Sequence, residues 1–402
     1  MLNFPLIRLG LTIAGLYLGS FSAQAQSAPA ALAVHPVRSI NPTDTIFSDL
    51  EFLRREIGAA RVVMLGEPTH GEGNVTEAKI RLMRFLKERM GFTTVAFESG
   101  FYELDRAQRE IQAGAAVPAA IASGVYPIWT QTQEFQALLP LLGKGGLRVA
   151  GFDSQLGGFQ DELLEELEAF LKPEKGADGL AYDYLDECLS MMEEQNIFPP
   201  SHQILIFDLQ LGKARRLLEK VAAGTDARRR ERAAFWLQNL RSIQALAHDY
   251  ATNDPGVKDS TEFKATDSNP RDAQMADNLL WYLRQHPREK VMCWGAVEHL
   301  ANKVEVLENA EIKDFRPMGR AVKAALGEDA VYVLGTLAGG GTYGFGYWGK
   351  HRLVPAPAAG SLEAELLAQG QDYSFVSLKH DAPRRVLTTY AFEYKPMAGE
   401  WS

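Results

Sequence analysis

Three polar side chains that can carry out acid–base chemistry follow two apolar runs of the sequence. Glu67 and His70 come just after the run Arg61–Leu65, and Glu98 directly follows the run Thr93–Phe97. Each run has the length and composition of a buried parallel strand. In open α/β sheets, ligands bind at the carboxyl ends of the strands. We therefore expect these residues to share a site, in which an imidazole between carboxylates transfers a proton.

Further charged side chains occupy comparable positions. Asp153 directly follows a third apolar run, and His299 lies a few residues beyond a fourth. Lys79 and Arg271 belong to helical patterns and are candidates for stabilising charge at the site. The alternative for each residue is a helix cap, a surface position or an ion pair that only holds loops together.

The elements that must position these residues alternate along the chain. Strands are predicted over 61–65, 93–97, 148–152, 290–294, 330–334, 374–378 and 386–390, and helices over 74–90, from 103, and at 160–171, 181–194, 202–221, 228–250 and 271–285. Asn74 with Glu77 has the pattern of a capping box, and Ser361 caps another helix. This alternation predicts an α/β fold with a mostly parallel central sheet flanked by helices.

Strand patterns are missing from about residue 157 to residue 288, where the sequence is helical throughout. We expect a helical insertion that covers the sheet between its third and later strands. Such a cap can close one wall of a pocket, or it can be a purely structural subdomain. The rest of residues 45–402 forms the α/β domain.

The N-terminus has the features of a secretory signal peptide. Arg8 precedes an apolar run, and Ala23-Gln24-Ala25 is an A-x-A cleavage site. We expect cleavage after Ala25, no membrane anchor afterwards, and a secreted or periplasmic protein. Residues 26–44 are rich in Ala, Ser and Pro and are predicted to be a flexible leader.

Charge and cysteine content narrow the class of protein. The 402-residue chain has a net charge of −9, and removal of the signal peptide with Arg8 makes it about −10, which argues against a nucleic-acid partner. Cys293 lies in an apolar run and is predicted to be a buried thiol, while a disulfide with Cys188 is left open. The sequence has no C-x-x-C zinc pattern and leaves the oligomeric state open.

Two common catalytic patterns are missing. No G-x-S-x-G occurs, so a serine nucleophile elbow is not indicated, and no H-E-x-x-H zinc motif occurs. The run Gly339–Gly344 matches G-x-G-x-x-G but does not open a helix, so we interpret it as a mobile glycine and aromatic loop near the mouth of the site.

Several motifs, taken in this order, resemble the erythromycin esterase family. They are G-E-x-x-H-G at 66–71, G-F-x-x-V-A-x-E at 91–98, G-F-D at 151–153, R-D-x-x-M-A-x-N at 271–278 and W-x-x-x-x-H at 294–299. The resemblance covers the chain from about residue 45 onward. It implies an α/β core with helical additions and hydrolysis of an ester, which for some members is the macrolactone of a macrolide antibiotic.

The resemblance also implies roles for individual residues. His70 would be the general base that activates water, and Glu67 and Glu98 would be essential carboxylates of the pocket. His299 matches the second histidine of a W-A-H-N-x-H segment, and Lys79 stands where the esterases have an arginine. The chain departs from that segment at two positions, because Ala296 and Val297 replace its first histidine and its asparagine.

Three hypotheses follow. The first is an exported hydrolase of a small-molecule ester or lactone that needs no cofactor. The second is a metal-dependent hydrolase, in which Glu67, His70, Glu98 and His299 bind a divalent ion such as zinc or manganese. The third is a protein that binds a small molecule or cofactor without catalysis.

Overall fold

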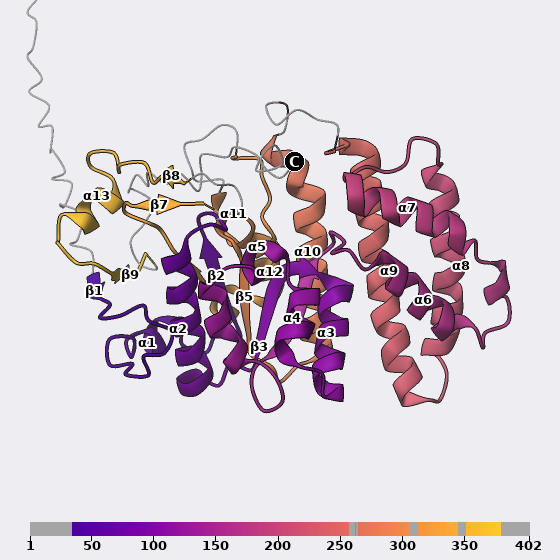
Figure 1. Cartoon of the computed structure of the whole chain (residues 1–402), viewed down its shortest axis with the longest axis horizontal. Helices are drawn as coiled ribbons and strands as arrows, with labels where there is room; N and C mark the ends of the chain where they lie inside the picture. Colours follow the sequence, from indigo (N-terminus) through magenta and orange to yellow (C-terminus); the bar gives the residue numbers. More distant parts are fainter. Residues whose placement is uncertain (1–33, 257–261, 263, 305–311, 345–350, 379–402) are drawn as a thin grey trace, which may run out of the picture.

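The computed structural model describes residues 34–256, 262, 264–304, 312–344 and 351–378. Its centre is a five-stranded parallel sheet in the order β4-β3-β5-β2-β6 (Figure 1). The strands are β2 (Val62–Glu67), β3 (Thr94–Gly100), β4 (Arg148–Asp153), β5 (Val291–Ala296) and β6 (Val331–Gly335). The predicted α/β fold with a parallel sheet flanked by helices is confirmed.

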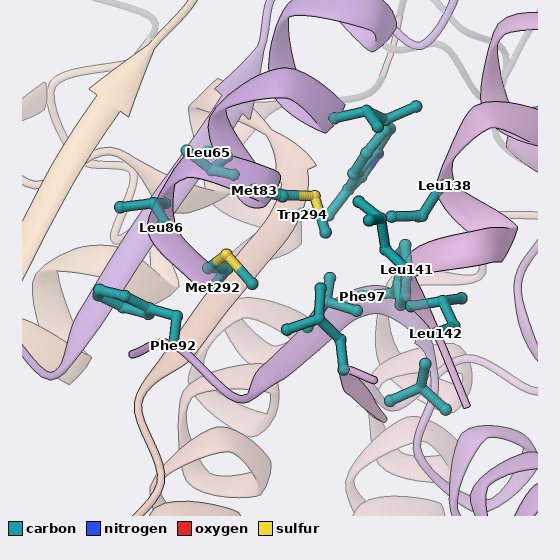
Figure 2. Close-up of a cluster of buried hydrophobic side chains, with 14 of the residues drawn as sticks. Leu65, Met83, Leu86, Phe92, Phe97, Leu138, Leu141, Leu142, Met292 and Trp294 are labelled. Carbon is teal, nitrogen blue, oxygen red and sulfur yellow. The ribbon is translucent and has the colours of Figure 1, made fainter. Parts of the chain in front are cut away.

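Alternating side chains of the strands bury the two faces of the sheet against different helices. On one face, Leu65 and Trp294 pack with α2 (Gly73–Met90) and the 3₁₀ helix η1 (Glu134–Leu141), as Figure 2 shows for part of this core. On the other face, Met64 and Cys293 pack with α10 (Asn269–Gln285) and α12 (Met318–Leu326). Both Cys188 and Cys293 are buried free thiols.

A second hydrophobic core lies beside the sheet, where Figure 1 shows a group of long helices at one side of the molecule. The helices are α6 (Gln160–Leu171), α7 (Tyr182–Gln195), α8 (Ile204–Ala222) and α9 (Ala227–Asn253). They pack on α3 (Phe101–Ala113) through Phe101 and Tyr102. The predicted helices of this region are confirmed, and α10, the last of them, packs on the sheet itself.

The remaining elements are short. They are β1 (Val34–Pro36), α1 (Leu53–Ile57), α4 (Val117–Gly124), α5 (Pro127–Thr130), η2 (Ala177–Gly179), η3 (Ala265–Ser268), α11 (Val297–Leu300), η5 (Glu328–Ala330), β7 (Thr342–Tyr343), β8 (Arg352–Leu353), α13 (Leu362–Leu367) and β9 (Ser374–Val376). Ser361 caps α13 as predicted, because its hydroxyl accepts from the Ala364 N–H.

Residues 34–44 of the predicted flexible leader are structured. β1 pairs with β9, and the guanidinium of the buried Arg81 donates to the Ser39 carbonyl, holding this segment against α2. The sequence composition missed these tertiary contacts. The predicted signal peptide and the predicted strand 386–390 lie outside the described residues.

The predicted capping box of α2 is wrong. The helix begins at Gly73, so Asn74 lies inside its first turn and Glu72 occupies the N-cap position. The C-terminus follows the usual rule, since Gly91 takes the left-handed conformation with φ of 71° that favours glycine. No helix among the described residues is long and apolar enough to cross a membrane.

Candidate active site

The predicted site residues gather at the carboxyl ends of the strands in two clusters. The His70 cluster consists of Glu67, His70, Lys79 and Trp129, and the His299 cluster consists of Glu98, Asp153, Arg271, Asp272 and His299. β5 separates them in the sheet, because it pairs with β2 on one side and with β3 on the other.

Glu67 is the centre of the His70 cluster. It ends β2, and three donors bind its buried carboxylate. The Lys79 ammonium lies 2.6 Å from Oε2, while Nδ1 of His70 and the indole Nε1–H of Trp129 each lie 2.7 Å from Oε1. The Lys79 nitrogen also lies 3.9 Å from the centre of the Trp294 ring. The two oxygens of the carboxylate are therefore held by three donors from three segments: α2, the loop after β2, and α5.

The charges of this cluster favour an ionised carboxylate and a basic imidazole. Burial alone would raise the pKa of Glu67, but the adjacent Lys79 and His70 hold it below its ordinary value. Burial alone would lower the pKa of His70, but the hydrogen bond and negative charge of Glu67 raise it above 6.5. The His70 side chain is 13% exposed, whereas Lys79 is fully buried. His70 is therefore the member of the pair that is open to solvent.

Arg271 organises the His299 cluster. Its Nε lies 3.1 Å from one oxygen of Asp153, and its Nη2 lies 2.5 Å from the other, which is the bidentate geometry of a strong arginine–carboxylate pair. Nη2 also lies 3.0 Å from Oε1 of Glu98. The second oxygen of Glu98 accepts the backbone N–H of Ala296 at 2.8 Å. The register of β3 and β4 shifts between Phe97 and Gly100, at the point where Glu98 leaves the regular ladder.

His299 is held between two carboxylates. Its Nδ1 lies 2.8 Å from Asp272, and its Nε2 lies 3.5 Å from Glu98. Burial opposes the charged ring, but these carboxylates outweigh it and raise the pKa of His299 to about 9. The pKa of Glu98, also against the effect of burial, falls to about 2 beside His299 and Arg271. Nη1 of Arg271 also lies 3.3 Å from Nε2 of His299, so the guanidinium opposes the positive charge that the two carboxylates stabilise on the ring.

Two aromatic residues connect the clusters. Trp129 stacks edge-on against the His70 ring, with centroids 5.0 Å apart. Tyr126, which comes one turn earlier and stacks with Trp129, lies close enough to Asp153 and Arg271 for their charges to act on its hydroxyl. Helix α9 also reaches the His299 cluster, since Tyr250 interacts electrostatically with Arg271.

The end of the glycine loop Gly339–Gly344 lies next to the loop that carries His70, in line with its expected place near the mouth of the site. The Gly344 N–H donates to the Gly71 carbonyl at 3.1 Å, and a Cβ at Gly71 would meet Gly344 at 2.9 Å. Glycine is needed at 71 because of this close approach. Glu72 accepts from the Thr69 hydroxyl at 2.7 Å and so supports the loop that carries His70.

The structure places every predicted site residue in one of the two clusters. Lys79, a candidate for stabilising charge at the site, lies against the buried Glu67 carboxylate. Sequence reasoning missed Trp129 and Asp272. Asp272 could have been found, because it directly follows Arg271, whereas Trp129 lies on the four-residue helix α5 and has no periodic signal. No group of three or more His, Cys, Asp or Glu residues in the described part of the chain is arranged to hold a metal.

Comparison with known families gives one match over most of the chain. A family model described as erythromycin esterase matches residues 87–396, more than half of the chain. The matched range includes the whole His299 cluster and begins after Glu67, His70 and Lys79.

Known relatives and solved structures cover nearly all of the chain. YbfO of Bacillus subtilis, named as a hydrolase, is 24% identical over 92% of this chain and 87% of its own. Erythromycin esterase type II of Escherichia coli is 24% identical over 85% of this chain and 86% of its own. A Bacillus cereus protein of solved structure has a TM-score of 0.67 at 20% identity, over 86% of this chain and 83% of its own. A mutant of the erythromycin esterase EreC in its open conformation has a TM-score of 0.55 at 17% identity, over the same shares. At these identities the structural likeness shows the fold.

Proposed function

Because the chain belongs to the erythromycin esterase family, we propose that it hydrolyses a carboxylic ester or lactone with water activated by His70. The observation that carries this proposal is the contact of 2.7 Å between Nδ1 of His70 and Oε1 of Glu67, at a ring that is partly open to solvent. A histidine oriented by a buried carboxylate is the usual arrangement for a general base.

The proposed first step is proton transfer from water. When Nδ1–H of His70 donates to Glu67, the lone pair of the neutral ring lies on Nε2. Nε2 takes a proton from water as the water oxygen bonds to the carbonyl carbon, and Glu67 stabilises the resulting imidazolium. Lys79 and Trp129 keep Glu67 ionised and oriented throughout this step.

Cations of the His299 cluster are proposed to stabilise the oxyanion that forms on the carbonyl. The Arg271 side chain is 18% exposed, and His299 carries a positive charge at neutral pH because its pKa is raised to about 9 by Asp272 and Glu98 against burial. A well-placed donor of this kind contributes about 3 kcal/mol to transition-state stabilisation.

The substrate is proposed to be a small uncharged ester or lactone, with macrolides as one class to test. The Escherichia coli relative is named an erythromycin esterase. Ala296 and Val297 replace a histidine and an asparagine of the segment that the family resemblance implies, so we propose a less polar pocket wall here. We further propose that the protein acts outside the cytoplasm after cleavage at Ala25, which N-terminal sequencing of the mature protein would test.

The test is a substrate screen with matched variants. A panel of alkyl esters, aryl esters and lactones, including erythromycin, is incubated with the protein and with His70→Ala. We expect kcat to fall by a factor of about 10²–10⁴ in the variant, the usual contribution of a general base. The control is His248→Ala, a half-exposed histidine on α9 that pairs with Asp208 and should leave activity unchanged.

Two outcomes would contradict the proposal. Activity that survives in His70→Ala would exclude His70 as the base. If no ester or lactone is hydrolysed but a member of the panel binds and His70→Ala weakens its binding, the protein is a binding protein.

A further inference from the structure

Glu298 lies at the junction of the two clusters. It belongs to α11. Val297 and Ala296 precede it along the chain, and His299 follows it directly. The Ala296 N–H donates to Glu98. α11 packs on the end of β2, where a Cβ added at Gly66 would lie 2.9 Å from Val297. This places the Glu298 backbone directly beyond the strand that carries Glu67.

The Glu298 carboxyl differs from the other acidic groups of the site in its partners. Its Oε2 is buried and has no hydrogen-bond partner among the residues that the structure describes. Glu67 and Glu98, in contrast, each bind a cation and further donors. A buried carboxyl oxygen that accepts no hydrogen bond favours the protonated form of the group.

The environment of Glu298 places it near both histidines. The pKa of the Glu298 carboxyl is raised to about 7, and burial is the main cause. The charges of His299 and His70 oppose this rise, and the charge of Glu98 adds to it. His70, in turn, has its own pKa raised by Glu98 and Glu298 after Glu67. A carboxyl that holds a proton near neutral pH beside an imidazole has the properties of a general acid.

We propose that Glu298 is the general acid that protonates the leaving alcohol, an inference that rests on the proposed esterase function. Water adds to the ester carbon and its proton goes to Nε2 of His70. The tetrahedral intermediate then collapses, its oxyanion re-forms the carbonyl, and the bond from carbon to the alkoxy oxygen breaks. That oxygen takes the proton of the Glu298 carboxyl and leaves as an alcohol.

The proton balance closes within the site. After the alcohol leaves, Glu298 is a carboxylate and His70 is an imidazolium. Transfer of a proton from His70 to Glu298, directly or through one water, restores both to their starting states. The net reaction converts an ester and a water into a carboxylic acid and an alcohol, and no further reactant is needed.

The test compares two esters of one acyl group in Glu298→Gln. An alkyl ester expels a strongly basic alkoxide that needs a proton, whereas a p-nitrophenyl ester expels a stable phenolate that does not. We expect kcat/KM for the alkyl ester to fall about 100-fold and that for the p-nitrophenyl ester to fall much less. Glu194→Gln, on the exposed side of α7, makes the same side-chain substitution away from the site and serves as the control.

The pH dependence of the wild-type rate tests the same proposal without any variant. The proposal expects the alkyl-ester rate of the wild-type protein to fall near pH 7, where Glu298, with its pKa raised to about 7 by burial, loses its proton. The p-nitrophenyl-ester rate should lack this limb and decline only near pH 9, where His299 loses its charge. Glu298→Asp should restore part of the alkyl-ester activity, because it keeps a carboxyl group.

The outcomes separate this proposal from the one on which it rests. If Glu298→Gln loses kcat/KM equally for both esters, or not at all, and His70→Ala is inactive on both, the role of Glu298 is overturned and the role of His70 stands. The absence of the limb near pH 7 with the alkyl ester would also overturn the role of Glu298. Activity of His70→Ala on the p-nitrophenyl ester would instead contradict the proposed function itself.

Discussion

The two histidines of the site have different surroundings. His70 contacts one carboxylate, Glu67, whose charge is shared with Lys79 and Trp129. His299 lies between two, Asp272 and Glu98. Both pKa values are raised despite burial, and that of His299 reaches about 9. His299 therefore has two carboxylates within 3.5 Å of its ring and His70 has one at 2.7 Å, while Glu98 and Glu298 act on His70 through their charges alone.

The His70 side chain is also the more exposed of the two histidines. The His70 side chain is 13% exposed and lies on a loop, whereas the His299 side chain is 9% exposed and is tied to α10 through Asp272. Asp272 is itself fixed, because its other oxygen accepts the Met318 N–H at 2.9 Å. The His70 cluster is built for proton transfer, and the His299 cluster is built to hold a fixed electrostatic field.

Removing Lys79 should have the largest effect on stability. Lys79→Met leaves the buried Glu67 carboxylate without its cation, and we expect the free energy of unfolding to fall by about 3–5 kcal/mol. Urea unfolding measures this value. Lys220→Met, on the exposed side of α8, is the matched control and should change stability by less than about 0.5 kcal/mol. Similar values for both variants would show that the buried pair does not stabilise the fold.

The His299 cluster should show its charge in the pH dependence of stability. The pKa of His299 in the folded protein, raised to about 9 by the adjacent carboxylates against burial, lies above the value of 6.5 expected when unfolded. Its contribution is therefore complete below pH 6.5 and is lost as the pH rises through 9. The difference corresponds to about 3 kcal/mol.

The comparison uses His299→Gln. Unfolding free energies measured from pH 6 to pH 9.5 should decline by about 3 kcal/mol more in the wild-type protein than in the variant. Parallel curves would mean that His299 is not a buried cation, and the contrast with His70 would then disappear.

A smaller effect is expected from the indole donor of the His70 cluster. Trp129→Phe removes a hydrogen bond to the ionised Glu67 as well as ring volume. Trp236→Phe is a matched control, because the buried Nε1 of Trp236 has no hydrogen-bond partner in the described part of the chain. We expect Trp129→Phe to cost about 2 kcal/mol more than the control in urea unfolding. An equal cost would show that the bond to Glu67 contributes little.

The sequence predicted the strands and the side chains at their ends because both depend on local patterns. Apolar runs marked β2, β3, β4, β5 and β6, and the polar residues predicted after the first four of these had few places to lie other than the edge of the sheet. The order of the strands could not be predicted in this way. β5 lies between β2 and β3 because of tertiary pairing, which leaves no trace in the periodicity of any single strand.

The partners that tune the site were harder to predict than the site residues themselves. Trp129 and Glu298 lie on helices of four residues, too short to show a helical repeat. Asp272 belongs to a long helical pattern that does not by itself mark a buried carboxylate, so only its place directly after Arg271 could have pointed to it. The capping box of α2 failed because the helix begins at Gly73, with Glu72 at its N-cap position, two residues before the position that the pattern marks.

The central position of β5 determines when the site can form during folding. The contact between the Ala296 N–H and Glu98 closes a loop of 198 residues, which contains all of the helices from α3 to α10. Closing so long a loop is slow, because its entropy is lost before the contact is made. A chain shortened before Val291 would carry Glu67, His70 and Glu98 but would lack the strand between them, so even a long nascent chain should be inactive.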